Sequence, residues 1–118
     1  MTQIAYSSAG VTIDDLNSHL DELWIELQTP GSWLRRQAEG VLQSQGEDPS
    51  KALKAIDSMA RSEAVTIKRV GAGIDPATTA VIVAFAPIAA KVVSDVWTLL
   101  FNRIKKKFGD DSLQKQEK

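Results

Sequence analysis

The sequence predicts a mainly α-helical fold with three short amphipathic helices, one short strand and a long, proline-kinked C-terminal helix. Leucines recur at intervals of three and four within residues 12–28, and a long apolar run follows the Asp-Pro pair at residues 75–76. Such intervals place leucines on one helix face, and proline is favoured at the first position of a helix. Because 118 residues is the size of one domain, we expect a helical domain over residues 1–109 and a polar tail over 110–118.

Each of the three short helices is predicted to begin beside a capping residue. Thr12 and Ser32 precede the first two helices, and Asp48-Pro49 begins the third. Pro30 ends the first helix before the second begins. The side chains of Thr12, Ser32 and Asp48 accept hydrogen bonds from the free N–H groups of the first turn. The apolar stripes are Leu16, Leu20, Leu23 and Leu27 in the first helix, Leu34, Ala38, Val41 and Leu42 in the second, and Leu53, Ile56 and Ala60 in the third.

Residues 64–70, AVTIKRV, predict a short strand because β-branched residues alternate there. An isolated strand leaves its backbone groups without partners. Two partners are open: the N-terminal segment around Ile4 and Tyr6, in a two-stranded ribbon, or the same strand of another copy of the chain.

Residues 77–104 are predicted to form the long helix, which begins near Pro76 and stops at Gly109. Its first half carries almost no polar side chain, and Pro87 is expected to kink it because proline removes one backbone hydrogen bond. The second half is amphipathic, and Lys91 and Asp95 are four residues apart, a spacing at which they can pair.

A helix that is apolar all round must be buried against something. A bilayer span needs about 20 apolar residues, and each charge near the centre costs about 2.5–3.5 kcal/mol. Lys91 and Asp95 therefore favour a protein interface, either with a second copy or with another protein, and membrane association or pore formation is the alternative. The predicted interface residues are Val81, Val83, Phe85, Ile88, Val92, Val96, Trp97, Leu100 and Ile104. The predicted contacts to anionic lipid or a partner are Arg103, Lys105, Lys106 and Lys107.

Nothing in the sequence assembles a catalytic, cofactor or metal site. The chain has no cysteine, and its one histidine, His19, is predicted to lie on the solvated face of the first helix. The turn in VTIKRVGAGIDP differs from a dinucleotide-binding loop because Pro76 replaces the third glycine and Asp75 would repel phosphate. We therefore expect no enzyme activity, no cofactor and no small-molecule substrate. The net charge of −1 gives nucleic acid no general attraction. The three tryptophans, Trp24, Trp33 and Trp97, are expected to pack in the core.

Residues 64–109 resemble the small effector-associated accessory proteins of bacterial conflict systems. The resemblance rests on a short strand, a G-x-D-P turn at residues 73–76, and an Ala/Val-rich run that ends in basic residues. It implies a non-enzymatic adaptor or signalling component that works beside a separate effector. The first ten residues lack the pattern of a signal peptide, so we expect a cytoplasmic protein, which in the membrane alternative would lie at the inner face of the membrane.

Overall fold

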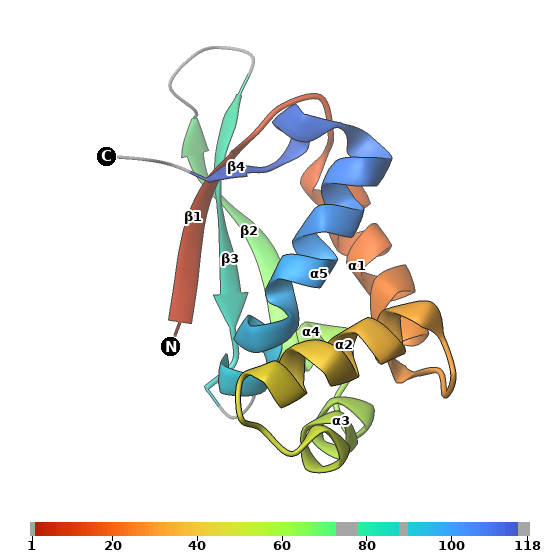
Figure 1. Cartoon of the computed structure of the whole chain (residues 1–118). Helices are drawn as coiled ribbons and strands as arrows, with labels where there is room; N and C mark the ends of the chain where they lie inside the picture. The colour runs from red at the N-terminus through yellow and green to blue at the C-terminus, as the bar shows by residue number, and fades with distance from the viewer. Residues whose placement is uncertain (1, 73–77, 88–89, 116–118) are drawn as a thin grey trace.

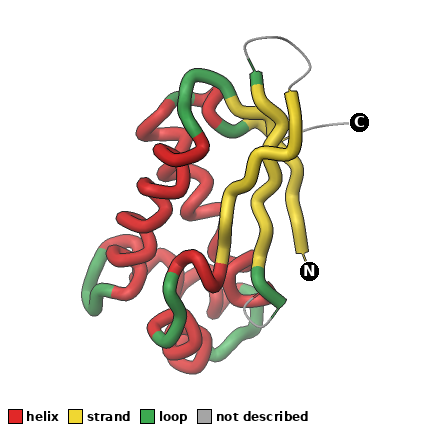
Figure 2. The backbone as a smooth tube through the Cα atoms, turned by 180° about the vertical axis from the view of Figure 1, so that it is seen from behind, coloured by secondary structure: helices red, strands yellow, loops and turns green. Residues whose placement is uncertain are grey.

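The computed structural model describes residues 2–72, 78–87 and 90–115 and places them in two layers. One layer is a four-stranded antiparallel sheet, and the helices lie on one face of it (Figures 1 and 2). The elements in chain order are β1 Thr2–Ser8, α1 Ile13–Gln28, α2 Trp33–Ser44, α3 Pro49–Asp57, α4 Arg61–Ala64, β2 Val65–Ala72, β3 Thr79–Phe85, α5 Ala90–Phe108, the 3-10 turn η1 Asp110–Ser112 and β4 Gln114–Lys115. The prediction of a mainly helical fold with one short strand is therefore wrong, because a four-stranded sheet forms one of the two layers.

The largest error concerns residues 79–85, which form strand β3 and not the first half of a helix. β3 lies between β1 and β2 and pairs antiparallel with both, in the sheet order β2-β3-β1-β4. A short apolar run can be a buried strand or a buried helix segment, and here two neighbouring strands satisfy its backbone groups. Helix α5 begins only at Ala90, and Pro87 lies in the connection before it, so Pro87 does not kink a helix.

The predicted strand at residues 64–70 is confirmed as β2, and the N-terminal segment is also a strand. The two strands do not pair with each other, however. Ile4 of β1 and Ile67 of β2 both lie opposite Val83 of β3, one on each side. The sheet therefore forms within one chain, with β3 supplying the partner that both segments require.

The three predicted short helices are confirmed, together with their caps. Thr12 accepts a hydrogen bond from the backbone N–H of Asp15 at 3.0 Å. Ser32 accepts one from the N–H of Arg35 at 3.1 Å, and Asp48 caps α3. The single turn α4, which leads into β2, was not predicted.

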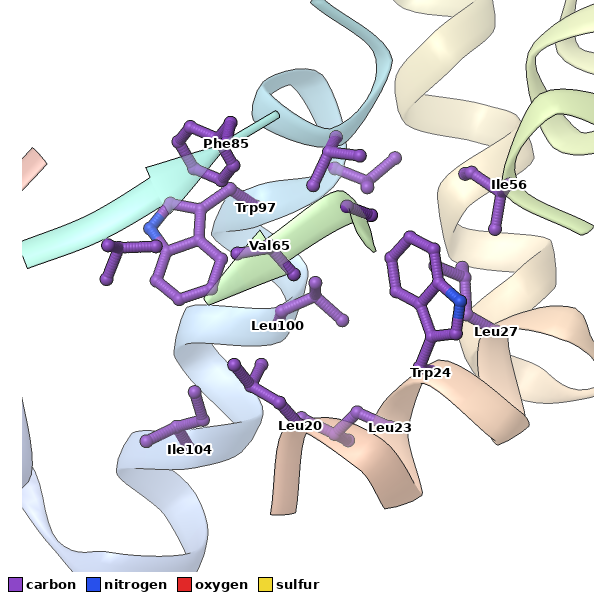
Figure 3. Close-up of a cluster of buried hydrophobic side chains, with 14 of the residues drawn as sticks. Leu20, Leu23, Trp24, Leu27, Ile56, Val65, Phe85, Trp97, Leu100 and Ile104 are labelled. Atoms are coloured by element: carbon purple, nitrogen blue, oxygen red, sulfur yellow. The ribbon is translucent and has the colours of Figure 1, made fainter. Parts of the chain in front are cut away.

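The core lies between the sheet and the helices, with α1 and α5 next to the strands (Figures 1 and 3). Its side chains come from strands β1, β2 and β3, from all five helices and from Leu113, which follows η1. Trp24 and Trp97 are buried as predicted, whereas Trp33 is 65% exposed and the prediction for it is wrong.

The C-terminal residues described by the structure continue the fold beyond residue 109. Leu113 is fully buried, and β4 pairs antiparallel with β1 so that Lys115 lies opposite Tyr6. Ser112 is also buried. The composition of residues 110–115 predicts a polar tail, but these residues belong to the fold and pair with the outer edge of β1.

Candidate functional site

The face of the sheet opposite the helices is left uncovered by the described part of the chain (Figure 2). Side chains alternate between the two faces of a sheet, so the neighbours of the core residues Tyr6, Ile67 and Val83 point to this side. We call this surface the open face and define it by Gln3, Ala5 and Ser7 of β1, Thr66 and Lys68 of β2, and Ala80, Ile82 and Ala84 of β3.

The strand register arranges the open face in rows across the sheet. Ala5 and Lys68 lie on either side of Ile82, while Gln3 and Thr66 lie on either side of Ala84. Lys68 is the one charged side chain among these eight positions and sits on the outermost strand. The centre of the face is consequently apolar, and it is flat because most of its side chains are alanine methyl groups.

The composition of β3 is unusual for a strand with one solvated face. Such strands commonly alternate apolar and polar residues, whereas strands that are buried on both faces are apolar throughout. β3 is apolar from Ala80 to Phe85, although the helices cover only one of its two sides. Ala80 and Ile82 retain partial exposure on the other side. The sequence of β3 therefore fits a strand that is covered on both faces.

A hollow lies at one end of the open face, beside α4. Its volume is about 220 Å³, and its lining includes Glu63, Thr66, Lys68, Ala84 and Pro87. Glu63 and Lys68 give this end a polar rim, in contrast to the alanine-rich centre. A protruding side chain of a docked partner could enter here without disturbing the sheet.

The predicted interface residues lie within the chain's own core. Val81, Val83, Phe85, Val96, Trp97, Leu100 and Ile104 are buried, Val92 packs against them, and Ile88 lies outside the described residues. They come from the helix-facing side of β3 and the inner side of α5, which the sequence had placed in one helix. The rings of Phe85 and Trp97 meet edge to face with their centroids 5.8 Å apart. Figure 3 shows the two side chains next to each other. The sequence-based prediction did not include the open-face residues of β3. The signal that could have identified them is that every residue from Ala80 to Phe85 is apolar, as in a strand covered on both faces.

Two of the four basic residues at the end of α5, Arg103 and Lys107, pair with acidic residues of α1. Arg103 lies 3.2 Å from the carboxylate of Glu26, and Lys107 lies 3.4 Å from that of Glu22. Lys105 lies over the ring of Phe101 at 5.1 Å from its centroid. Lys106 lines a polar groove of about 620 Å³ between α1, α2 and α5, which also contains the exposed indole of Trp33. Arg103 and Lys107 thus link α5 to α1.

His19 does not lie on a freely solvated face. Its side chain is 12% exposed, its Nδ1 lies 2.9 Å from Glu22 Oε2, and its ring meets Phe108 edge to face at 5.5 Å. The hydrogen bond from His19 and the positive charge of Lys107 hold the pKa of Glu22 below its ordinary value. Among the described residues, no three His, Cys, Asp or Glu side chains are grouped so that they could bind a metal ion.

Lys91 and Asp95, which lie in the middle of the predicted long helix, belong to α5, where the side chain of Lys91 is exposed and that of Asp95 is largely buried. Lys91 lies 3.5 Å from Asp95, which confirms the predicted pair, and 3.0 Å from Glu47. The hydrogen bond to Glu47 raises the pKa of Lys91, and Asp95 adds to this effect. Across the described ranges, no helix combines the length and the apolar character that crossing a membrane would require.

Comparisons with protein-family models, with curated proteins and with solved structures found no match to this chain.

Proposed function

We propose that this chain is a non-enzymatic protein-interaction module that self-associates through the open face of its sheet. The observation that supports the proposal is the mismatch in β3, which is apolar on both sides while helices cover one side. Ala84 is already buried, whereas Ala5, Ala80 and Ile82 keep exposed surface, and burying it would remove apolar area from water at roughly 25 cal/mol for each Å². The sheet would then lie between its own helices and a partner.

A second copy of the chain is the partner that this surface fits best. A two-fold contact places the same patch of both copies together, so the patch has to complement itself. A flat apolar surface does so, because it presents no charge pattern that requires an opposite pattern. Lys68 lies on the outer strand, and a two-fold axis near β1 and β3 would keep the two lysines apart. The alanines allow two sheets to approach to about 10 Å, the usual spacing of stacked sheets.

The size of the open face indicates a weak association. Strands β1 and β3 are 7 residues long and β2 is 8 residues long. With a strand spacing of about 4.8 Å and about 3.3 Å for each residue, three strands of about seven residues span roughly 330 Å². A stable interface buries about 800 Å² on each partner. We therefore expect a dimer that forms at high protein concentration and dissociates on dilution.

Ile82→Glu tests the proposal, because it places a charge at the centre of the open face while the side chain still points away from the core. Ile25→Glu is the matched control, since Ile25 is 66% exposed on α1. Sedimentation velocity over a concentration series should give a rising mass for the wild type and for Ile25→Glu. Ile82→Glu should remain a monomer with an unchanged circular dichroism spectrum. A wild type that stays monomeric throughout, or an Ile82→Glu variant that dimerises equally well, would refute the proposal.

We also propose that the chain acts as an adaptor and is located in the cytoplasm. The resemblance to accessory proteins of conflict systems supports an adaptor that assembles beside an effector. One of its features, the apolar run after residue 76, belongs here to β3 and a shorter α5. Self-association through a sheet would serve such an adaptor, since a dimer presents two copies of any second binding surface.

A further inference from the structure

The outer edge of β2 is closed by a side chain from α1. The Asn17 Nδ2 donates a hydrogen bond to the carbonyl oxygen of Ile67 at 3.0 Å, and the backbone N–H of Ile67 donates one to Asn17 Oδ1 at 3.1 Å. In an antiparallel sheet, a residue exchanges one N–H and one C=O bond with the residue opposite it. The Asn17 amide therefore takes the place that a residue of a neighbouring strand would occupy.

Arg61 extends this cap along the edge. Its Nη1 donates to the carbonyl oxygen of Val65 at 3.2 Å and to Asn17 Oδ1 at 3.3 Å, while its Nε donates to Asp21 at 2.8 Å. Outward-pointing backbone groups recur at every second residue of a strand, so Val65 and Ile67 belong to the same outer row. The cap thus covers two successive positions of that row.

The rest of the edge is short and irregular. Arg69 is the next residue of the outer row, and the pairing with β3 shifts between Arg69 and Gly71 in a bulge. Bulges and charged side chains are two means by which proteins discourage pairing at sheet edges. The neighbouring Val70 is 57% exposed, so this end would offer apolar contact to an incoming strand if the capped positions were open.

We propose that the Asn17–Arg61 cap withholds the β2 edge from strand pairing and so confines self-association to the open face. The strand that fits the uncapped edge is β2 of a second copy, in antiparallel alignment. Copies that used both the edge and the open face would grow without closing, since each contact leaves the other free. The confinement to the open face rests on the proposed function, whereas the closure of the edge by Asn17 does not.

Asn17→Ala tests the cap, with Ser18→Ala as the control at the next, exposed position of α1. In the wild-type background, Asn17→Ala should give species larger than a dimer by sedimentation velocity, whereas Ser18→Ala should not. In the Ile82→Glu background, which removes the open-face contact, Asn17→Ala should double the mass of the monomer. The mass of Asn17→Ala in the Ile82→Glu background does not depend on the open face. This measurement therefore tests the cap separately from the proposed self-association.

Arg69→Pro separates edge pairing from aggregation through unfolding. Proline at Arg69 removes an outward N–H and leaves the ladder to β3 in place. Adding it to Asn17→Ala in the Ile82→Glu background should restore the monomer mass, and the Ile67 amide of dilute Asn17→Ala should exchange with solvent at least tenfold faster than in the wild type. An unchanged mass for Asn17→Ala in that background, or a raised mass that Arg69→Pro does not reverse, would overturn the inference.

Discussion

The indole Nε1–H of Trp97 donates a hydrogen bond to the phenol oxygen of Tyr6 at 2.8 Å, and both side chains are buried. Tyr6 belongs to β1 and Trp97 to α5, so this bond joins the sheet to the helix layer. The ring of Phe101, also from α5, lies 5.4 Å from that of Tyr6 between centroids. A buried indole N–H needs an acceptor, and Tyr6 provides it inside the core.

Tyr6→Phe should destabilise the protein by about 1–3 kcal/mol, the usual cost of leaving a buried donor without its acceptor. Phenylalanine keeps the ring and its packing, so the loss reports on the hydrogen bond to Trp97. Urea unfolding at pH 7 measures the change in the free energy of unfolding. An unchanged midpoint would mean that the indole N–H finds another acceptor in the variant.

Alkaline pH should destabilise the wild type through Tyr6. Burial raises the pKa of Tyr6, partly opposed by the hydrogen bond from Trp97. A folded-state pKa above the unfolded value of about 10 means that folding favours the neutral phenol. The stability is therefore fully present below pH 10 and is lost as the pH rises through the folded-state pKa. Urea midpoints between pH 8 and 12 should fall for the wild type and stay flatter for Tyr6→Phe. Since Tyr6 is the single tyrosine, absorbance at 295 nm should place its ionisation above pH 10.

The N-terminal helices could be predicted because their signals are local. Thr12, Ser32 and Asp48 each act within three residues of the helix that they begin, and leucine spacing marks the buried face. The error at residues 79–85 has the opposite origin. β3 is a strand because β1, more than seventy residues earlier in the chain, pairs along its whole length. A run without polar residues carries no period, and a contact so distant in sequence leaves no local sign of which structure it selects.

The candidate site was missed for the same reason. A helix over residues 79–85 would join their apolar residues into one surface, whereas the strand separates Val83 from Ile82 onto opposite faces of the sheet. The C-terminal segment was also misjudged, because its polar composition conceals Leu113, which fills the core after η1. A single apolar residue in a polar segment shows no periodicity that would predict its burial, although its side chain can fill a place in the core.

Leu113→Ala should cost about 2–5 kcal/mol, the usual range for truncating a fully buried leucine. Gln114→Ala, at an exposed position of β4, is the control and should change little. Thermal and urea unfolding of both variants measure the difference. Equal stability of Leu113→Ala and the wild type would restore the interpretation of residues 110–118 as a polar tail.

His19→Ala should destabilise the protein by about 0.5–1.5 kcal/mol through loss of the edge-to-face contact with Phe108. It should also raise the pKa of Glu22, because the hydrogen bond from His19 is the main cause that lowers it. Chemical denaturation gives the first quantity, and NMR titration of the Glu22 carboxyl carbon gives the second. Ser18→Ala is the neighbouring control, and a Glu22 pKa that does not move would show that Lys107 alone governs that carboxylate.

Side chains of β3 point alternately to the core and to the open face, so substitutions at neighbouring positions should differ sharply in their effect on folding. Val83→Glu should prevent folding, because Val83 is fully buried and an unpaired carboxylate there would lose its hydration. Ile82→Glu should leave the unfolding free energy within about 1 kcal/mol of the wild type, the span of strand propensities. Far-ultraviolet circular dichroism and urea unfolding at low concentration separate the two cases. If residues 79–85 were instead a helix packed on all sides, both glutamates would be buried and both variants would unfold. Folded Ile82→Glu beside unfolded Val83→Glu is therefore the result expected of a strand with one covered face in the monomer.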